Sequence, residues 1–91
     1  MAIVNMLELS SVHLSSDTRS LLTDASPLIL DHIAVYDSEY GWFIPVDTDS
    51  TEDLPEDLTA CILHAHKLGC MWLHFDSDAD ICDELPRYDW H

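Results

Sequence analysis

The sequence predicts a single small α+β domain over residues 1–91, with the element order β-α-β-β-α-β of a ferredoxin-like split βαβ sandwich. A length of 91 residues is typical of one domain. Short runs rich in β-branched and aromatic residues alternate with two stretches of helical periodicity. With 47% hydrophobic residues, the chain is too apolar for the compositional class of disordered proteins. A three-stranded antiparallel meander with two helices on one face is the alternative arrangement.

The first strand and the first helix are predicted from the N-terminal third of the chain. Residues 3–14 alternate apolar and polar side chains, with one slip in phase that predicts a bulge or an early end. Residues 15–24 predict a helix, because Ser15 is a favoured N-cap and an acid follows in the first turn. We expect this helix to bury Leu21 and Leu22.

Residues 28–36 and 40–46 predict two strands that form a hairpin through a polar turn at residues 37–39. Pro45 lies inside the second of these strands. Because proline cannot donate to a β-ladder, we expect that strand at an edge of the sheet.

The second helix is the clearest element in the sequence. Pro55 suits the first helical position, and the acids after it suit the positive end of the helix dipole. Gly69 is the expected C′ residue, and residues 70–75 predict the last strand. One apolar face at helical spacing consists of Leu58, Cys61, Ile62, Ala65 and Leu68.

The charge of the chain excludes several classes of function. Three Lys and Arg against 18 Asp and Glu give a formal net charge of −15. Three cations cannot release enough counterions to bind nucleic acid through its phosphates, and an anionic membrane surface repels the chain. We therefore expect no direct contact with nucleic acid or membrane. The expected partner is a basic DNA-binding protein or complex, bound by a monomer or a homodimer.

Two segments are especially acidic, with six acids in residues 47–57 and five in residues 76–84. We expect them at opposite ends of the second helix and the last strand. Alternate carboxylates on an extended stretch would lie about 6.7 Å apart, a spacing comparable with that of DNA phosphates. A solvated loop and a solvated helix start are the alternative interpretation. The predicted partner-binding residues are Asp47, Asp49, Glu52, Asp53, Glu56, Asp57, Asp76, Asp78, Asp80, Asp83, Glu84, Tyr40 and Trp90.

Asp76 to Asp80 is similar to the first positions of an EF-hand calcium loop. That loop requires glycine at its sixth position and a bidentate glutamate at its twelfth. Ile81 and Arg87 stand there instead. A weak divalent-cation site at these acids is the alternative to a solvated turn.

Cys61, His64, His66 and Cys70 have a spacing typical of zinc ligands. On a helix, however, His64 and His66 point about 200° apart, and Cys61 belongs to the apolar face. No arrangement of serine, cysteine, histidine and aspartate predicts a catalytic centre. We therefore expect a protein that is not an enzyme, with no catalytic residues, no metal and no cofactor.

The compartment is predicted from the cysteines and the N-terminus. Three cysteines, an odd number without a disulfide-dense pattern, favour a reducing cytoplasm. The N-terminus has no basic region typical of a signal peptide. No apolar run approaches the roughly 18 residues of a membrane span.

The segment Glu39-Tyr40-Gly41-Trp42-Phe43 and the ending Leu85-Pro86-x-Tyr88-Asp89-Trp90 are the most distinctive motifs. With them the chain resembles a small family of uncharacterised bacterial, plasmid and phage proteins, a domain of unknown function. No catalytic residue carries over from such a family. The resemblance implies an accessory role in conflicts between mobile elements and their bacterial host, in the host cytoplasm.

Charge and resemblance together give the leading hypothesis, an anti-defence inhibitor (anti-CRISPR or anti-restriction). It would act as an acidic DNA mimic in the positively charged channel of a host nuclease or effector complex. An acidic protein–protein adaptor, which binds through a sheet edge or terminal aromatics, is the first alternative. A small divalent-metal-binding module is the second.

Overall fold

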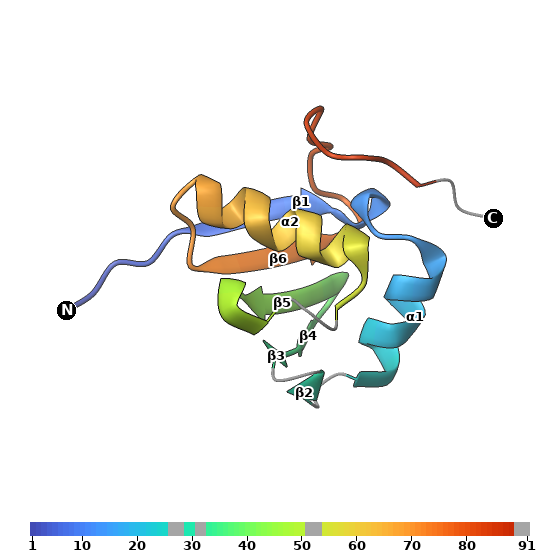
Figure 1. Ribbon diagram of the computed structural model, residues 1–91, viewed down its shortest axis with the longest axis horizontal. Coiled ribbons are helices and arrows are strands. Elements are labelled where there is room, and N and C mark those ends of the chain that lie inside the picture. The colour runs from blue at the N-terminus through green and yellow to red at the C-terminus, as the bar shows by residue number, and fades with distance from the viewer. Residues whose placement is uncertain (26–28, 31–32, 51–53, 89–91) are drawn as a thin grey trace.

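The computed structural model describes residues 1–25, 29–30, 33–50 and 54–88, which form an α+β domain around a four-stranded mixed sheet (Figure 1). The predicted α+β class with two α-helices is confirmed, but four short strands and not two lie between the helices along the chain. The elements are β1 (Met6–Ser10), η1 (Ser11–His13), α1 (Ser16–Ala25), β2 (Ile29–Leu30), β3 (Ile33–Ala34), β4 (Tyr36–Ser38), β5 (Gly41–Pro45), η2 (Thr48–Ser50), α2 (Glu56–Lys67) and β6 (Trp72–Asp76).

The strands of the main sheet lie in the order β1-β6-β5-β4, and β2 and β3 form a separate antiparallel pair. β6 is parallel to β1 and antiparallel to β5, which is in turn antiparallel to β4. This order corrects the ferredoxin-like prediction. A split βαβ unit places another strand between the two that a helix connects, whereas α2 connects β5 to its direct neighbour β6. Only residues 68–71 separate α2 from β6, and β6 lies between β1 and β5.

The alternative meander describes part of this sheet. β4, β5 and β6 are consecutive in the chain and are antiparallel neighbours. β1 then adds a fourth strand by parallel pairing with β6.

Within the part of the chain that the structure describes, no helix has the length and apolarity to cross a membrane.

The first strand ends early, as predicted, because Ser10 turns the chain. Its side-chain oxygen accepts a hydrogen bond from the Val12 amide at 3.2 Å and begins the short helix η1. Ser15 then caps α1, since its hydroxyl oxygen accepts a hydrogen bond from the Thr18 amide at 3.2 Å.

Of the two leucines that α1 was predicted to bury in the hydrophobic core, one is buried. Leu22 is fully buried, whereas Leu21 is 38% exposed. Consecutive residues of a helix point about 100° apart, and α1 directs Leu22 to the core and Leu21 toward solvent. α1 stands at one end of the molecule, on the side where α2 begins (Figure 1).

The predicted hairpin is present, with its turn at residues 39–40 and its paired strands β4 and β5. The predicted strand over residues 28–36 is instead divided among β2, β3 and the start of β4, with residues 28 and 31–32 outside the described residues. The edge position predicted from Pro45 is wrong for β5, which lies between β6 and β4. β4, however, pairs only as far as Phe43. Val46 donates to Met71 at 2.9 Å, so the nitrogen of Pro45 faces the side that β4 no longer occupies.

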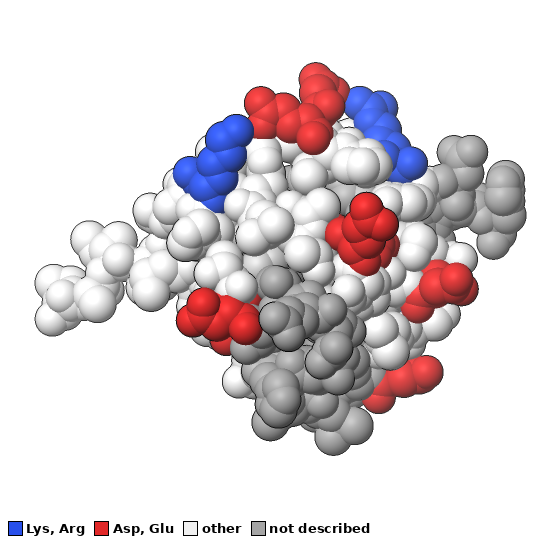
Figure 2. Space-filling view, viewed as in Figure 1, with Lys and Arg blue, Asp and Glu red and all other residues white. Residues whose placement is uncertain are grey.

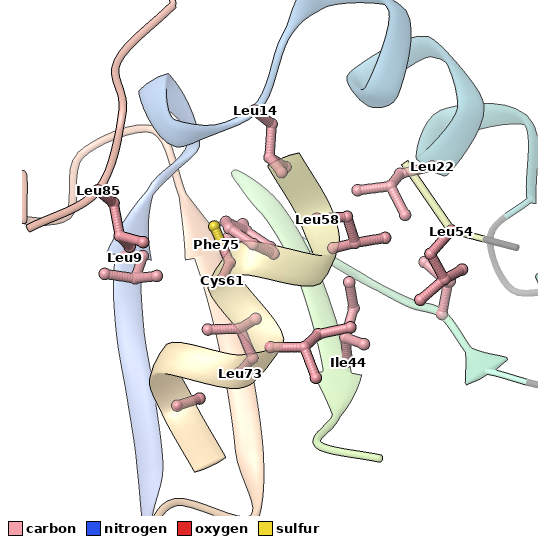
Figure 3. Close-up of a cluster of buried hydrophobic side chains, with 13 residues drawn as sticks. Leu9, Leu14, Leu22, Ile44, Leu54, Leu58, Cys61, Leu73, Phe75 and Leu85 are labelled. Atoms are coloured by element: carbon pink, nitrogen blue, oxygen red, sulfur yellow. The ribbon is translucent and has the colours of Figure 1, made fainter. Parts of the chain in front are cut away.

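α2 lies across one face of the sheet and forms the core with it (Figures 1 and 3). Of the predicted apolar face, all residues but Leu68 are buried. Leu68 is 53% exposed because the helix ends just before it. From the sheet, alternate residues of three strands point into the same core, among them Leu9, Ile44, Leu73 and Phe75.

Two glycines occupy positions that favour glycine for different reasons. Gly69 ends α2 at φ 77°, and its amide donates to His66 while that of Cys70 donates to Ala65. This pair of bonds is a Schellman motif, as predicted for a C′ glycine. At Gly41, a Cβ would collide with the backbone carbonyl of Phe75 on β6.

The segment after β6 is irregular, as predicted, but His13 fixes it to the body of the domain. His13 is 1% exposed; its Nδ1–H donates to the Pro86 carbonyl at 2.8 Å. Its Nε2 accepts from the Cys82 amide at 2.9 Å. Since a carbonyl can only accept and an amide can only donate, the ring is neutral with its proton on Nδ1. Tyr88 adds a backbone bond to Val12 at 2.9 Å.

Asp57 joins the starts of the two α-helices. One carboxylate oxygen accepts from the Ser15 amide and the other from the Thr18 hydroxyl, both at 2.7 Å. Asp57 and Thr18 are buried, at 9% and 3% exposure. The carboxylate thus satisfies donors at the start of α1 while lying in the first turn of α2, where the helix dipole favours a negative charge.

Replacing Asp57 with alanine tests this link. Asp57→Ala leaves two buried donors without acceptors, so we expect the free energy of unfolding to fall by about 2 kcal/mol or more. Glu56→Ala is the matched control, because Glu56 is the exposed neighbour in the same helical turn. Urea unfolding of both variants measures the difference. Equal losses in the two variants would contradict the structural role of Asp57.

Candidate functional site

The first candidate site is the acidic surface. Among the predicted partner-binding acids, Asp47 and Asp76 are half-buried and Asp57 is buried. The exposed members are Asp49, Glu56, Asp78, Asp80, Asp83 and Glu84. Glu52, Asp53 and Trp90 lie outside the described residues. Asp57 is therefore removed from the predicted surface, since both of its oxygens bind within the domain.

The first acids of the two segments, Asp47 and Asp76, lie at opposite ends of the sheet. The prediction is wrong for the rest of residues 47–57, because Asp57 binds Ser15 and Thr18, just beyond the end of β1 that lies beside Asp76. Asp47 follows Pro45, which pairs with Trp72 at the start of β6. Asp76 ends β6 and pairs with Gly41 at the start of β5. Figure 2 shows acidic side chains at several separate places across one face of the molecule. The surface is therefore a dispersed set of charges and not one concentrated patch.

The predicted extended stretch at Asp76 to Asp80 is wrong, because these residues form a turn. The Asp78 amide donates to the Asp76 carboxylate at 2.8 Å, and the Ala79 amide donates to the Asp76 carbonyl at 3.1 Å. Aspartate commonly bonds to the amide two residues ahead in this way. The extended backbone from which a spacing like that of DNA phosphates was predicted is therefore not present at these acids.

Few cations compensate these charges among the described residues. Arg87 pairs with Asp83 at 2.8 Å, and both side chains are exposed. An exposed pair of this kind contributes little to stability. The other two ion pairs have histidine as the base, His64 with Glu84 and His74 with Glu8, and these histidines carry charge only when protonated.

The second candidate site lies on the face of the sheet opposite α2. His74 alternates with the core residues of β6 and is 8% exposed. Its Nδ1–H donates to the Glu8 carboxylate at 3.1 Å, and its Nε2 lies 3.1 Å from the Ser38 hydroxyl. Its ring stacks on Phe43, with centroids 4.1 Å apart. Four strands thus hold this imidazole in one orientation.

Beside His74 lies a shallow apolar hollow of about 320 Å³, lined by Tyr36, Phe43 and Trp72. Tyr36 is 47% exposed, and its ring centroid lies 6.1 Å from that of Trp72. Tyr40, the predicted aromatic contact, is 55% exposed at the hairpin turn and does not line the hollow.

The third candidate site is a group of three potential metal ligands at the start of the C-terminal segment. His64 Nε2 lies 3.6 Å from Cys82 Sγ and 3.6 Å from Glu84 Oε2. The three ligand atoms lie within 4.8 Å of one another. His64 and Cys82 are half-buried, and Glu84 is exposed.

The sequence did not predict this group. His64 was considered with Cys61, His66 and Cys70, whereas its neighbours in space are Cys82 and Glu84. Cys82 follows His64 by 18 residues and reaches it only because His13 fixes the C-terminal segment. No spacing rule of a local metal motif covers such a pair.

Cys61, next to this group on α2, is a small buried hydrophobe, as predicted. Burial raises the pKa of its thiol to about 12, and the charges of Asp57 and Cys82 act in the same direction. Burial likewise raises the pKa of Tyr88, together with Asp57 and Glu56. All three cysteines are free thiols.

The fold and the surface define a small acidic α+β domain with α2 on one face of its sheet. The chain belongs to a family of unknown function (DUF5983): the model of the family's C-terminal domain matches residues 6–90. The comparison with curated proteins found no match, and the comparison with solved structures found none either. The resemblance to an uncharacterised family is thereby confirmed at the level of the family.

Alkaline unfolding tests the environment of Cys61. An unfolded thiol ionises near pH 9, whereas the folded thiol keeps its proton to about pH 12. The native state then binds more protons than the unfolded state, so stability falls as pH rises between these values. From pH 8 to pH 10 we expect the unfolding free energy of the wild type to fall by about 1 kcal/mol more than that of Cys61→Ala.

Urea unfolding with a reductant present measures both proteins at the two pH values. The test compares how steeply the unfolding free energy falls with pH in the two proteins, and not the stability of either protein alone. Parallel pH dependences would contradict a buried, protonated Cys61.

Proposed function

We propose that this domain is an anti-defence inhibitor, of the anti-restriction or anti-CRISPR kind. It binds the positively charged DNA channel of a host nuclease or effector complex and excludes DNA. The observation that carries this proposal is the large excess of acids over basic residues at the surface of the domain. The net charge is −15, and Asp57 alone of the described acids is buried.

Long-range electrostatic attraction between the acidic domain and a basic partner surface supports this function. An excess charge on a compact body destabilises it by self-repulsion and raises the rate of association with an oppositely charged surface. Acids at both ends of β6 allow contacts along the length of the sheet. Because the Asp76–Asp80 turn removes a regular spacing, the inhibitor competes through total charge and shape, without copying the phosphate positions of one DNA strand.

The resemblance to bacterial, plasmid and phage proteins supports the same proposal. A mobile element that enters a bacterium meets nucleases whose DNA channels are basic, and these work in the host cytoplasm. The motifs that carry this resemblance include Glu39 to Phe43, which form the turn and the start of β5.

A second candidate function is a protein–protein adaptor. The hollow formed by Tyr36, Phe43 and Trp72 favours it, because exposed aromatic groups supply contact area at interfaces. In this function the acids steer the partner and the aromatic side chains hold it.

Charge reversal tests the inhibitor. We immobilise the domain, capture host DNA-binding proteins at low salt and release them with duplex DNA. Asp78→Lys with Asp80→Lys should lower capture by at least about tenfold, because these exposed acids face the basic channel. Asp24→Lys with Asp37→Lys is the control of equal charge at exposed positions on α1 and β4. Capture that is unchanged from about 0.05 to about 0.5 M salt, or that DNA does not reverse, would contradict the inhibitor.

Truncation of the hollow tests the adaptor. Tyr36→Ala should abolish capture by an adaptor through the loss of a central aromatic contact, and should leave binding by a charge-driven inhibitor nearly unchanged. Met71→Ala is the control, since Met71 is 58% exposed but does not line the hollow. If Tyr36→Ala removes binding while Asp78→Lys with Asp80→Lys retains it, the adaptor replaces the inhibitor.

A further inference from the structure

The group of His64, Cys82 and Glu84 has a chemistry that the proposed inhibition does not use. A thiol, an imidazole and a carboxylate are the three side-chain types that bind zinc in proteins. Among the described residues this is the one set of three or more potential ligands whose donor atoms converge. Asp76, Asp78 and Asp80, which the sequence offered as a calcium loop, do not converge in this way.

The orientation of His64 distinguishes a metal site from a catalytic triad. In a triad the imidazole stands between its partners, with the nucleophile at one ring nitrogen and the carboxylate at the other. Here Cys82 Sγ and Glu84 Oε2 both lie nearest to the same atom, Nε2. That arrangement prevents a proton relay through the ring and directs three donor atoms toward one point.

The distances suit a tetrahedral zinc ion. Bonds of about 2.3 Å to sulfur and about 2.0–2.1 Å to nitrogen or oxygen give tetrahedron edges of about 3.4–3.6 Å. The measured separations from Nε2 are 3.6 Å to sulfur and 3.6 Å to oxygen. The separation between Sγ and the carboxylate is bounded only by 4.8 Å, so binding also requires Glu84 to move toward Cys82, and its side chain is 71% exposed.

Two of the three ligands stand on fixed backbone. His64 lies within α2, and its side chain is only 11% exposed. The Cys82 amide is held by His13 at 2.9 Å, which fixes the start of the C-terminal segment against the body of the domain. The ligand positions are thus pre-organised by contacts that do not depend on the metal, as an effective binding site requires.

Charge favours a cation at this place. The domain carries a net charge of −15, and the two nearest acids to the group in sequence are Asp83 and Glu84 itself. A zinc ion bound to one thiolate and one carboxylate is neutral overall, so binding relieves repulsion without placing a net positive charge in a half-buried site.

We propose that His64 Nε2, Cys82 Sγ and the Glu84 carboxylate bind one zinc ion, with a fourth position open to water or an external ligand. The Cys82 thiol releases its proton to solvent on binding, because the thiolate is the ligand. The ion then joins α2 to the C-terminal segment. This site is independent of the proposed inhibition, and either can fail without the other.

Cobalt(II) titration tests the site, since cobalt replaces zinc and a thiolate ligand gives a charge-transfer band in the near ultraviolet. We expect the band to saturate at one equivalent and to disappear when zinc is added. Cys82→Ser should lose the band, whereas Cys70→Ser, a matched half-buried thiol, should keep it. Absence of the band in the wild type, or its survival in Cys82→Ser, would overturn the proposal.

A second variant and a second readout distinguish loss of the metal site from loss of the folded structure. His64→Ala should weaken zinc binding by at least about tenfold, and alanine is well tolerated within a helix. Zinc should raise the melting temperature of the wild type by several degrees and leave that of His64→Ala unchanged, while His66→Ala behaves like the wild type. Equal stabilisation of all three proteins by zinc would place the ion elsewhere and overturn the proposal.

Discussion

The packing of α2 on one face of the sheet is the constraint on which the rest of the structure depends. A domain of this size has room for one core, and the apolar face of α2 closes it against β1, β6 and β5. Gly41 permits β5 to approach β6 where a side chain would collide with the Phe75 carbonyl. With the core closed on one side, the acids stay outside it, apart from Asp57, and the second sheet face is left to His74 and the aromatic side chains.

The C-terminal segment depends on this core in turn. His13 ends η1, the short helix after β1, and is buried, so its two ring nitrogens have fixed positions from which to bind Pro86 and the Cys82 amide. These bonds lay the segment along η1 and toward α2, where Cys82 meets His64. The side chains with the most specific chemistry thus come together through tertiary packing, and their separation in the sequence hides them.

Features that depend on neighbouring residues were predictable from the sequence, whereas contacts between residues far apart in the chain were not. Gly69 was predicted as the C′ residue because helix termination depends on neighbouring residues alone. The order of the strands depends on which strands β6 pairs with after α2, and no local sequence pattern determines those partners. Asp57 was assigned to the surface because its partners, Ser15 and Thr18, are about 40 residues away. A turn at Asp76 to Asp80 was predictable from local chemistry, since aspartate bonds the amide two residues ahead, whereas the extended geometry assumed for a DNA-like spacing was wrong.

Zinc-edge anomalous diffraction from crystals grown with one equivalent of zinc tests most directly whether the fold assembles a site from distant residues. We predict one strong peak at bonding distance, about 2.0–2.3 Å, from His64 Nε2, Cys82 Sγ and a Glu84 oxygen. A peak at the Asp76–Asp80 turn, or no ordered zinc between α2 and the C-terminal segment, would contradict it.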